Sequence, residues 1–243
     1  MKRIILFAAA LEVTYLALSF LLAQFYGQWS YEGELVRTGL RLIPIVFYGY
    51  CYQKYCYNEN QKFNIQTLFA PQFVVAIVLL LLFAAAYTNA DNEPVLWQLV
   101  FVISGIAAGL REELFYRGLV QSALQKKYNQ NVALALASLL FTLSHVQYLY
   151  YGQFSGLLLI CFAGIIFGSV FIYSGSIVFT ASIHGLYDAV LSINLLPHRL
   201  GNELETPLLF LIVLIFLIIK NKKVFSYQSM KTGGGNPDNL SMG

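Results

Sequence analysis

Between Lys127 and Asp188 the chain has no aspartate, glutamate, lysine or arginine for 60 consecutive residues. A second stretch without these four residue types runs from Lys62 to Asp91. Both are longer than the run of about 20 apolar residues that takes a helix across about 30 Å of hydrocarbon. The longer stretch has room for three spans joined by short turns. The sequence therefore predicts an integral, multi-pass membrane protein.

The overall composition excludes the main soluble classes. Of the 243 residues, 58% are hydrophobic and 11% are charged, whereas a typical globular domain has about 25% charged residues. This composition also excludes an intrinsically disordered chain, which needs low hydrophobicity and high charge. The net charge of +3 is small and dispersed, so we expect membrane lipids and no nucleic acid among the partners.

The apolar runs predict an all-α bundle of about eight transmembrane helices. The expected spans are residues 4–26, 37–57, 67–88, 95–124, 131–150, 154–173, 177–196 and 205–221. They would form a single transmembrane domain over residues 1–230. The tail at 231–243 contains three consecutive glycines, and we expect it to be disordered.

Lysine and arginine are distributed unevenly between the two expected faces of the membrane. With the N-terminus inside, ten basic residues fall in inner segments, and only Arg37, Arg41 and Arg199 fall in outer loops. Cytoplasmic loops are enriched in basic residues. This bias predicts an even number of spans with both termini in the cytoplasm.

A small group of ionisable residues is expected at membrane depth. An ionised side chain at the centre of a membrane helix costs about 2.5–3.5 kcal/mol on insertion scales, so each is a functional candidate. Seven of the eight lie on the fourth, fifth and seventh expected spans, and Glu12 stands apart without an assigned role. The eight are Glu12, Arg111, Glu112, Glu113, Arg117, His145, His184 and Asp188.

The fourth expected span contains two adjacent glutamates with different surroundings. Glu113 and Arg117 are four residues apart, so they share a helix face and can neutralise each other. Glu112 points about 100° away, and we expect it to have no such partner. A carboxylate in an apolar site suits a general base that activates water. Pure helix–helix ion pairing of both glutamates is the alternative.

The two histidines extend this group. Asp188 follows His184 by four residues, so its carboxylate could orient the imidazole, while His145 stands alone in an apolar helix. Either histidine could instead be a packing residue. If they converge with Glu112, one histidine and the glutamate could activate water while the other stabilises an oxyanion. Glu112, His145 and His184 could also hold a divalent metal such as zinc, although no cofactor is certain from the sequence.

Three motifs formed by these residues occur in a fixed order. Glu112-Glu113 with Arg117 reads as EExxxR, Phe141 with His145 as FxxxH, and His184 with Asp188 as HxxxN/D. In this order on a multi-span protein, the motifs resemble the CAAX protease and bacteriocin-processing family of intramembrane proteases, also called CPBP or Abi. The matching region is about residues 95–196.

The resemblance implies an eight-helix CAAX-protease-like bundle with a cavity open to the cytosol. It implies an intramembrane endopeptidase of glutamate type or metallo type that cleaves a peptide or membrane-anchored protein near the cytosolic face. The cleavage would serve CAAX-like processing or bacteriocin maturation and immunity. The compact length is more similar to that of a bacterial member of the family, which would place the protein in a bacterial cell membrane. A non-catalytic binding or immunity scaffold on the same fold is the alternative.

The resemblance also implies a role for each motif residue. Glu112 would be the base, assisted by His145, while His184 and Asp188 would stabilise the oxyanion. Glu113, Arg117 and Phe141 would support the helix arrangement.

Overall fold

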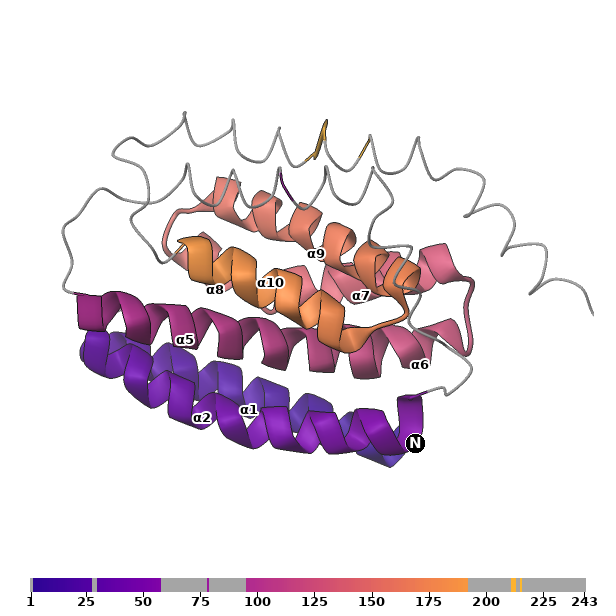
Figure 1. Cartoon of the computed structure of the whole chain (residues 1–243), viewed down its shortest axis with the longest axis horizontal. Helices are drawn as coiled ribbons and strands as arrows, with labels where there is room; N and C mark the ends of the chain where they lie inside the picture. The colour runs from indigo at the N-terminus through magenta and orange to yellow at the C-terminus, as the bar shows by residue number, and fades with distance from the viewer. Residues whose placement is uncertain are drawn as a thin grey trace, which may run out of the picture.

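The computed structural model describes residues 2–27, 30–57, 78, 95–191, 211–212 and 215. These residues form helices and no strand, which confirms the all-α prediction. The elements, shown in Figure 1, are α1 (Lys2–Tyr26), α2 (Tyr31–Cys51), the π-helix η1 (Tyr52–Cys56), α5 (Val95–Glu112), the π-helix η2 (Glu113–Gln121), α6 (Ser122–Gln125), α7 (Gln130–Leu143), α8 (Gln147–Tyr150), α9 (Phe154–Ser174) and α10 (Ile177–Leu191).

Three helical segments are long and apolar enough to cross a membrane: Arg3–Tyr26, Gln130–Tyr150 and Phe154–Ser174. Ile177–Val190 is apolar but shorter. The first three agree with the expected spans at 4–26, 131–150 and 154–173 and support an integral membrane protein. The described helices α2 and α5, which lie on the expected spans at 37–57 and 95–124, are not among the three. The expected spans at 67–88 and 205–221 and the tail at 231–243 lie almost entirely outside the described residues.

The second helix begins earlier than the apolar pattern predicted. Ser30 caps α2, accepting a hydrogen bond at 3.1 Å from the backbone nitrogen of Gly33, and two acidic residues in the first turn favour this helix start. As a result, Arg37 and Arg41 lie inside α2 and not in an outer loop. Counting both arginines among the outer-loop residues was therefore wrong, and the expected span at 37–57 already contained them.

Helix α5 is the centre of the described bundle. It packs against α2 on one side and α10 on the other, while α1 packs on α2 and α7 packs on α9. Figure 1 shows α1 and α2 as one layer, α5 next to them, and α7, α9 and α10 beyond it. The motif residues therefore lie on α5, on its continuation η2, on α10, which packs against α5, and on or just after α7, which packs against η2.

Small residues let α5 and α10 approach at backbone distance. A Cβ added at Gly109 would lie 2.6 Å from the nitrogen of Gly185, and one added at Gly105 would lie 3.0 Å from the backbone of Asp188. Gly105 and Gly109 form the GxxxG spacing that brings membrane helices together. This close contact places the segment after His184 directly against the end of α5.

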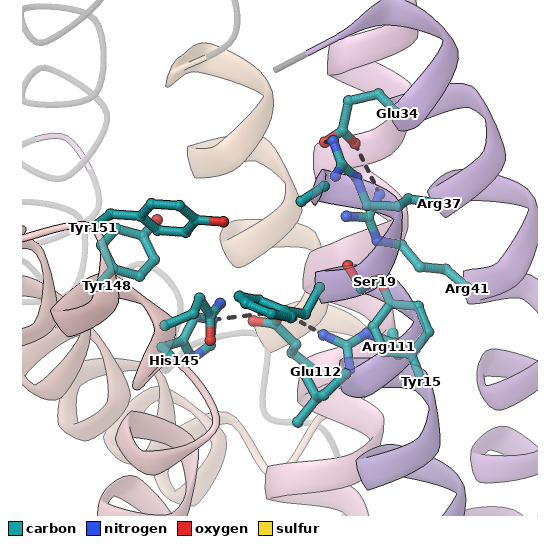
Figure 2. A pocket seen from close by; sticks show the side chains of 14 residues that line it. Tyr15, Ser19, Glu34, Arg37, Arg41, Arg111, Glu112, His145, Tyr148 and Tyr151 are labelled. Carbon is teal, nitrogen blue, oxygen red and sulfur yellow. Dashed lines mark hydrogen bonds and ion pairs between the residues drawn. The ribbon is translucent and has the colours of Figure 1, made fainter. Parts of the chain in front are cut away.

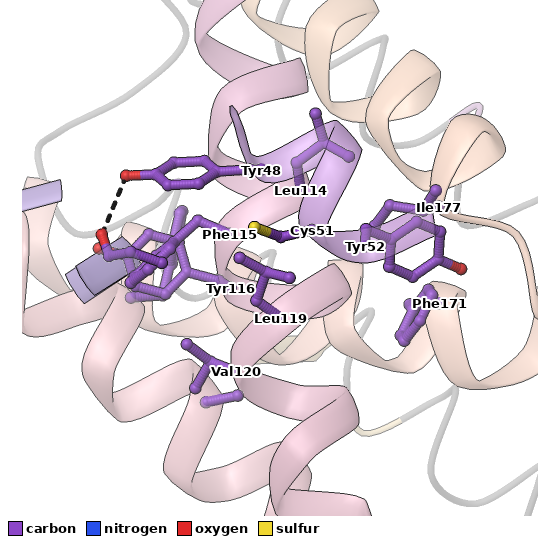
Figure 3. Close-up of a cluster of buried hydrophobic side chains, with 13 residues drawn as sticks. Tyr48, Cys51, Tyr52, Leu114, Phe115, Tyr116, Leu119, Val120, Phe171 and Ile177 are labelled. Atoms are coloured by element: carbon purple, nitrogen blue, oxygen red, sulfur yellow. Dashed lines mark hydrogen bonds between the residues drawn. The ribbon is translucent and has the colours of Figure 1, made fainter. Parts of the chain in front are cut away.

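The π-helix η2 is buried along its whole length and forms the core of the bundle. All nine of its residues are buried, and its apolar side chains pack with Tyr48, Cys51 and Tyr52 from α2 and η1 (Figure 3). Two polar side chains of η2 reach the backbone of α9. Arg117 Nη2 donates to the carbonyl of Gly164 at 3.0 Å, and Gln121 Nε2 donates to that of Gly168 at 3.2 Å.

The two ends of the bundle differ in character. The N-terminus, η1 and α6 lie at one end of the long axis, and α8 lies at the other (Figure 1). The first end is basic, with Lys54 on η1 and Lys126 after α6, where Lys126 donates to the carbonyl of Tyr55 at 3.2 Å. The other end is aromatic, with Tyr31 and Trp97 stacked at 5.6 Å between ring centroids.

Candidate active site

Glu112 is the last residue of α5, where the α-helix changes to the π-helix η2. Its carboxylate lies between two imidazoles. Glu112 Oε1 is 3.9 Å from His145 Nε2, and Glu112 Oε2 is 3.8 Å from His184 Nε2. Asp188 Oδ2 is 3.6 Å from the same nitrogen of His184. The structure thus brings together all four residues that the sequence predicted to be catalytic, from α5, from the turn after α7 and from α10.

The expectation that Glu112 has no ionic partner was wrong. Arg111 Nη2 donates to Glu112 Oε1 at 2.7 Å, and Arg111 Nη1 is paired with the carboxylate of Glu12 on α1. Glu12 also accepts a hydrogen bond at 2.9 Å from the hydroxyl of Tyr48. The guanidinium of Arg111 lies 4.2 Å from the ring centroid of Tyr15. Arg111 is therefore shared between two buried carboxylates, which lets Glu112 remain ionised in an apolar bundle.

His145 has a defined tautomer. Helix α7 ends at Leu143, and the turn that follows places His145 Nδ1 2.9 Å from the carbonyl oxygen of Phe141. A carbonyl can only accept, so Nδ1 carries the hydrogen and Nε2 of a neutral imidazole has a free lone pair. That lone pair faces Glu112 (Figure 2).

His184 is oriented by a residue other than the one predicted. Its Nδ1 lies 2.8 Å from Glu113 Oε1 and donates to it, whereas the 3.6 Å distance to Asp188 exceeds a direct hydrogen bond. The imidazole also stacks on the ring of Phe167, with centroids 4.2 Å apart and planes at 18°. Glu113 and Phe167 therefore fix the ring, and Asp188 supplies a nearby negative charge.

The supporting residues form a second buried group below the site. Arg117 Nε is 3.2 Å from Glu113 Oε2, and neither side chain is exposed. The ring of Phe141 lies 4.9 Å from the guanidinium of Arg117, 4.9 Å from the ring of His145 and 6.0 Å from that of His184. The predicted ion pair on one helix face is confirmed. Phe141 therefore contacts Arg117 and both histidines and supports the group from below.

A cavity of about 210 Å³ opens beside Glu112. One water requires roughly 10–15 Å³ on this measure, so the cavity can admit a larger group. Figure 2 shows Glu112 and His145 on its wall, facing the arginines of α2 across it. His184 and Asp188 are not among the lining residues, although His184 Nε2 lies 3.8 Å from Glu112 Oε2. The lining residues are Tyr15, Leu16, Ser19, Phe20, Ala23, Glu34, Arg37, Arg41, Arg111, Glu112, His145, Gln147, Tyr148 and Tyr151.

The donor set was also tested for a metal ion. Among the described residues, no group of three or more histidine, cysteine, aspartate or glutamate side chains is arranged to hold one. Arg111 already occupies Glu112 Oε1, and its charge beside the carboxylate disfavours a further cation at that oxygen. Glu112, His145 and His184 in this arrangement therefore do not fit a zinc site.

Sequence reasoning missed several residues of the site. Glu12 was recognised as unusual, but its partner Arg111 was not identified, because the two lie 99 residues apart. Phe167 carries no signal in the sequence that separates it from other aromatic residues of its span. Arg37 and Arg41 were assigned to a loop, and the serine cap that precedes them was the signal that could have placed them on a helix.

Comparison with known proteins identifies the family. Residues 92–190, about two fifths of the chain, match the family model described as Type II CAAX prenyl endopeptidase Rce1-like. No curated protein and no solved structure matches the chain significantly. The matched region includes all three motifs and the residues that face Glu112 directly, which are Arg111, His145 and His184. Glu12, Tyr15 and Tyr48 lie outside it. The family predicted from the motifs is thus confirmed, and this chain carries an Rce1-like domain of the CAAX protease family.

Proposed function

We propose that the protein is an intramembrane endopeptidase that hydrolyses a peptide bond with a water activated by Glu112 and His145. The observation that supports this most directly is the position of Glu112, with one imidazole Nε2 at 3.8 Å and another at 3.9 Å. Such gaps are too long for direct hydrogen bonds and leave room for a bridging atom. The family match supports protease activity in general.

The polarity of the two groups that face the gap suits a nucleophilic water. Ionised Glu112 and Nε2 of neutral His145 are both acceptors, so a water between them would donate one hydrogen to each. Its lone pairs would then point into the cavity toward the substrate carbonyl. As the water oxygen attacks the carbonyl carbon, its proton passes to Glu112, which returns it to the leaving amine when the C–N bond breaks.

His184 is suited to stabilise negative charge. Its Nδ1 donates to Glu113, so in the imidazolium form its Nε2–H faces Glu112 Oε2 at 3.8 Å. Asp188 and Glu113 compensate the charge of that imidazolium. We assign the stabilisation of the oxyanion to His184, with Asp188 compensating the charge of its imidazolium.

The face at which hydrolysis occurs follows from the two ends of the bundle. The cavity is lined by the second half of α1 and the first half of α2, so it lies away from the basic end with the N-terminus. If the N-terminus is cytoplasmic, this half of α1 and the cavity beside it face the outer side of the membrane. We favour the Lys/Arg bias and place the cleaved bond toward the outer face of a bacterial membrane.

Cysteine labelling tests this orientation. Ser19 lines the cavity, and Ser19→Cys can be made in a variant without Cys51, Cys56 and Cys161. A membrane-impermeant maleimide should label it in intact cells. Labelling that requires permeabilised cells would assign the cavity to the cytosolic side and reverse the proposed orientation of the bundle in the membrane.

Mapping of protein termini tests the activity itself. Membranes of cells with the wild-type protein should contain new termini that are absent with Glu112→Gln at equal expression. Cleavage at a prenylated CAAX-type C-terminus is the first candidate from the family description, and a bacteriocin precursor is the second; the termini themselves distinguish them. If no termini differ and a cellular phenotype survives the substitution, the protein is a non-catalytic scaffold.

A further inference from the structure

A cluster of charged residues on α2 lines the cavity opposite Glu112. Glu34 Oε1 pairs with Arg37 Nη2 at 2.7 Å, and Glu34 Oε2 lies 3.3 Å from Arg41 Nη1. Ser104 on α5 donates to Glu34 and accepts from Arg41. The ion pairs of this cluster join two arginines to one carboxylate. The cluster therefore brings a net positive charge to a largely buried wall of the cavity.

Arg41 has an unused hydrogen-bonding edge. All of its hydrogen bonds, to Glu34 and to Ser104, are made through Nη1, and its buried Nε has no hydrogen-bond partner. Only 11% of its side chain is exposed. A buried donor without a partner is costly, and the Nε–Nη2 edge of a guanidinium has the spacing that binds both oxygens of a carboxylate.

From this geometry we infer that Arg41 and the cluster around it bind a carboxylate of the peptide substrate. This inference rests on the proposed function, because Arg41 lines the same cavity as Glu112 and His145 (Figure 2). A carboxylate held at Arg41 sets which peptide bond reaches Glu112. The enzyme thus cleaves at a fixed distance from a negative charge, which is either the C-terminal carboxylate or an acidic side chain.

A peptide library distinguishes these two sources. The purified full-length protein in detergent is incubated with one library synthesised both as C-terminal acids and as C-terminal amides, with and without aspartate and glutamate. Mass spectrometry then locates each cleaved bond. If Arg41 binds the terminal carboxylate, cleavage should occur at a constant distance from the C-terminus, and only in peptides that end in a free acid. A side-chain carboxylate predicts a constant distance from aspartate or glutamate in both forms.

Substitution of Arg41 tests the contact. Arg41→Met should lower the preference for carboxylate-bearing peptides, as a ratio of kcat/KM values, by about 10- to 100-fold, the range for a hydrogen bond to a charged group. Arg41→Lys retains the charge without the two-donor edge and should lose an intermediate amount. Glu34 keeps its ion pair with Arg37 in both variants, so we expect the fold to persist, which thermal unfolding checks.

A binding measurement separates this inference from the proposed activity. In Glu112→Gln protein, the acid library should raise the Tm more than the amide library, and Arg41→Met should abolish that difference. This result supports the carboxylate site even if no peptide is cleaved, in which case only the proposed activity fails. Cleavage without any carboxylate preference, or equal Tm shifts with acids and amides, overturns the inference.

Discussion

The contact between α5 and α10 controls the position of His184, and a single methyl group should disturb it. Gly109→Ala would place a Cβ 2.6 Å from the nitrogen and 2.8 Å from the Cα of Gly185. Ordinary contacts between such atoms are about 3.5 Å, so the helices must separate by about 0.8 Å. Both opposing atoms belong to the backbone, so no side-chain rotation can relieve the clash. His184 directly precedes Gly185 and must move with it.

Two consequences can be given a size. Overpacking of a well-packed interface costs about 1–3 kcal/mol of unfolding free energy. A displacement of about 1 Å in a catalytic constellation lowers the rate by about a hundredfold. Gly109→Ala should therefore reduce cleavage about a hundredfold while the protein stays folded.

The assay compares Gly109→Ala with a matched variant on another helix. Gly39 on α2 is exposed, and a Cβ added there meets nothing within 4 Å. Gly39→Ala should keep wild-type cleavage and gain slightly in stability. Cleavage is read from the yield of the termini that depend on Glu112, and stability from unfolding in detergent. Equal behaviour of the two variants would refute the backbone contact, and loss of stability with full activity would refute the link to His184.

Four further predictions concern the groups around the site. Arg117→Met leaves Glu113 buried without its cation and should cost about 3–5 kcal/mol of unfolding free energy. The double variant with Glu113→Gln should lose less than the sum of the two single variants, as equilibrium unfolding in detergent can show. Simple additivity would contradict the pairing of Glu113 with Arg117. Phe141→Ala should cost about 3–5 kcal/mol of unfolding free energy in the same assay, and Phe141→Leu much less. Equal losses in the two variants would contradict the packing of the ring against the histidines. Glu12→Gln leaves the full charge of Arg111 on Glu112, so the carboxylate becomes a weaker base and cleavage should fall about ten- to a hundredfold; unchanged cleavage would show that Arg111 is not shared in this way. Treatment with 1,10-phenanthroline should leave the cleavage rate unchanged, and its loss would indicate a metal at this site.

Much of the site was predictable because its signals are local. An i, i+4 spacing on one helix is sufficient to predict that Glu113 and Arg117 meet, and they do so even though the segment is a π-helix. The clustering of ionisable residues on three apolar segments likewise identified Glu112, His145 and His184. The reason is energetic: a charge in a membrane helix is expensive, so the few that occur tend to be used.

Other contacts depend on packing between distant segments. The sequence alone predicted that Asp188 orients His184, yet Glu113 occupies Nδ1 because the close approach of α5 and α10 brings Glu113 nearer. The sequence also predicted that Glu112 has no ionic partner. In the structure Arg111 pairs with both Glu112 and Glu12, and this arrangement requires α1 to lie alongside α5.

The sequence by itself determined the membrane location, the helical class and the identity of the motif residues. Hydrophobicity over about 20 residues and helical spacing are properties of a single segment, so no partner is needed to read them. The tertiary structure alone decided which carboxylate each cation and imidazole contacts, and that the cavity lies beside the second half of α1 and the first half of α2. Those outcomes depend on how helices far apart in the chain pack together, as at the glycine contact between α5 and α10, and residue spacing along the chain does not encode that packing.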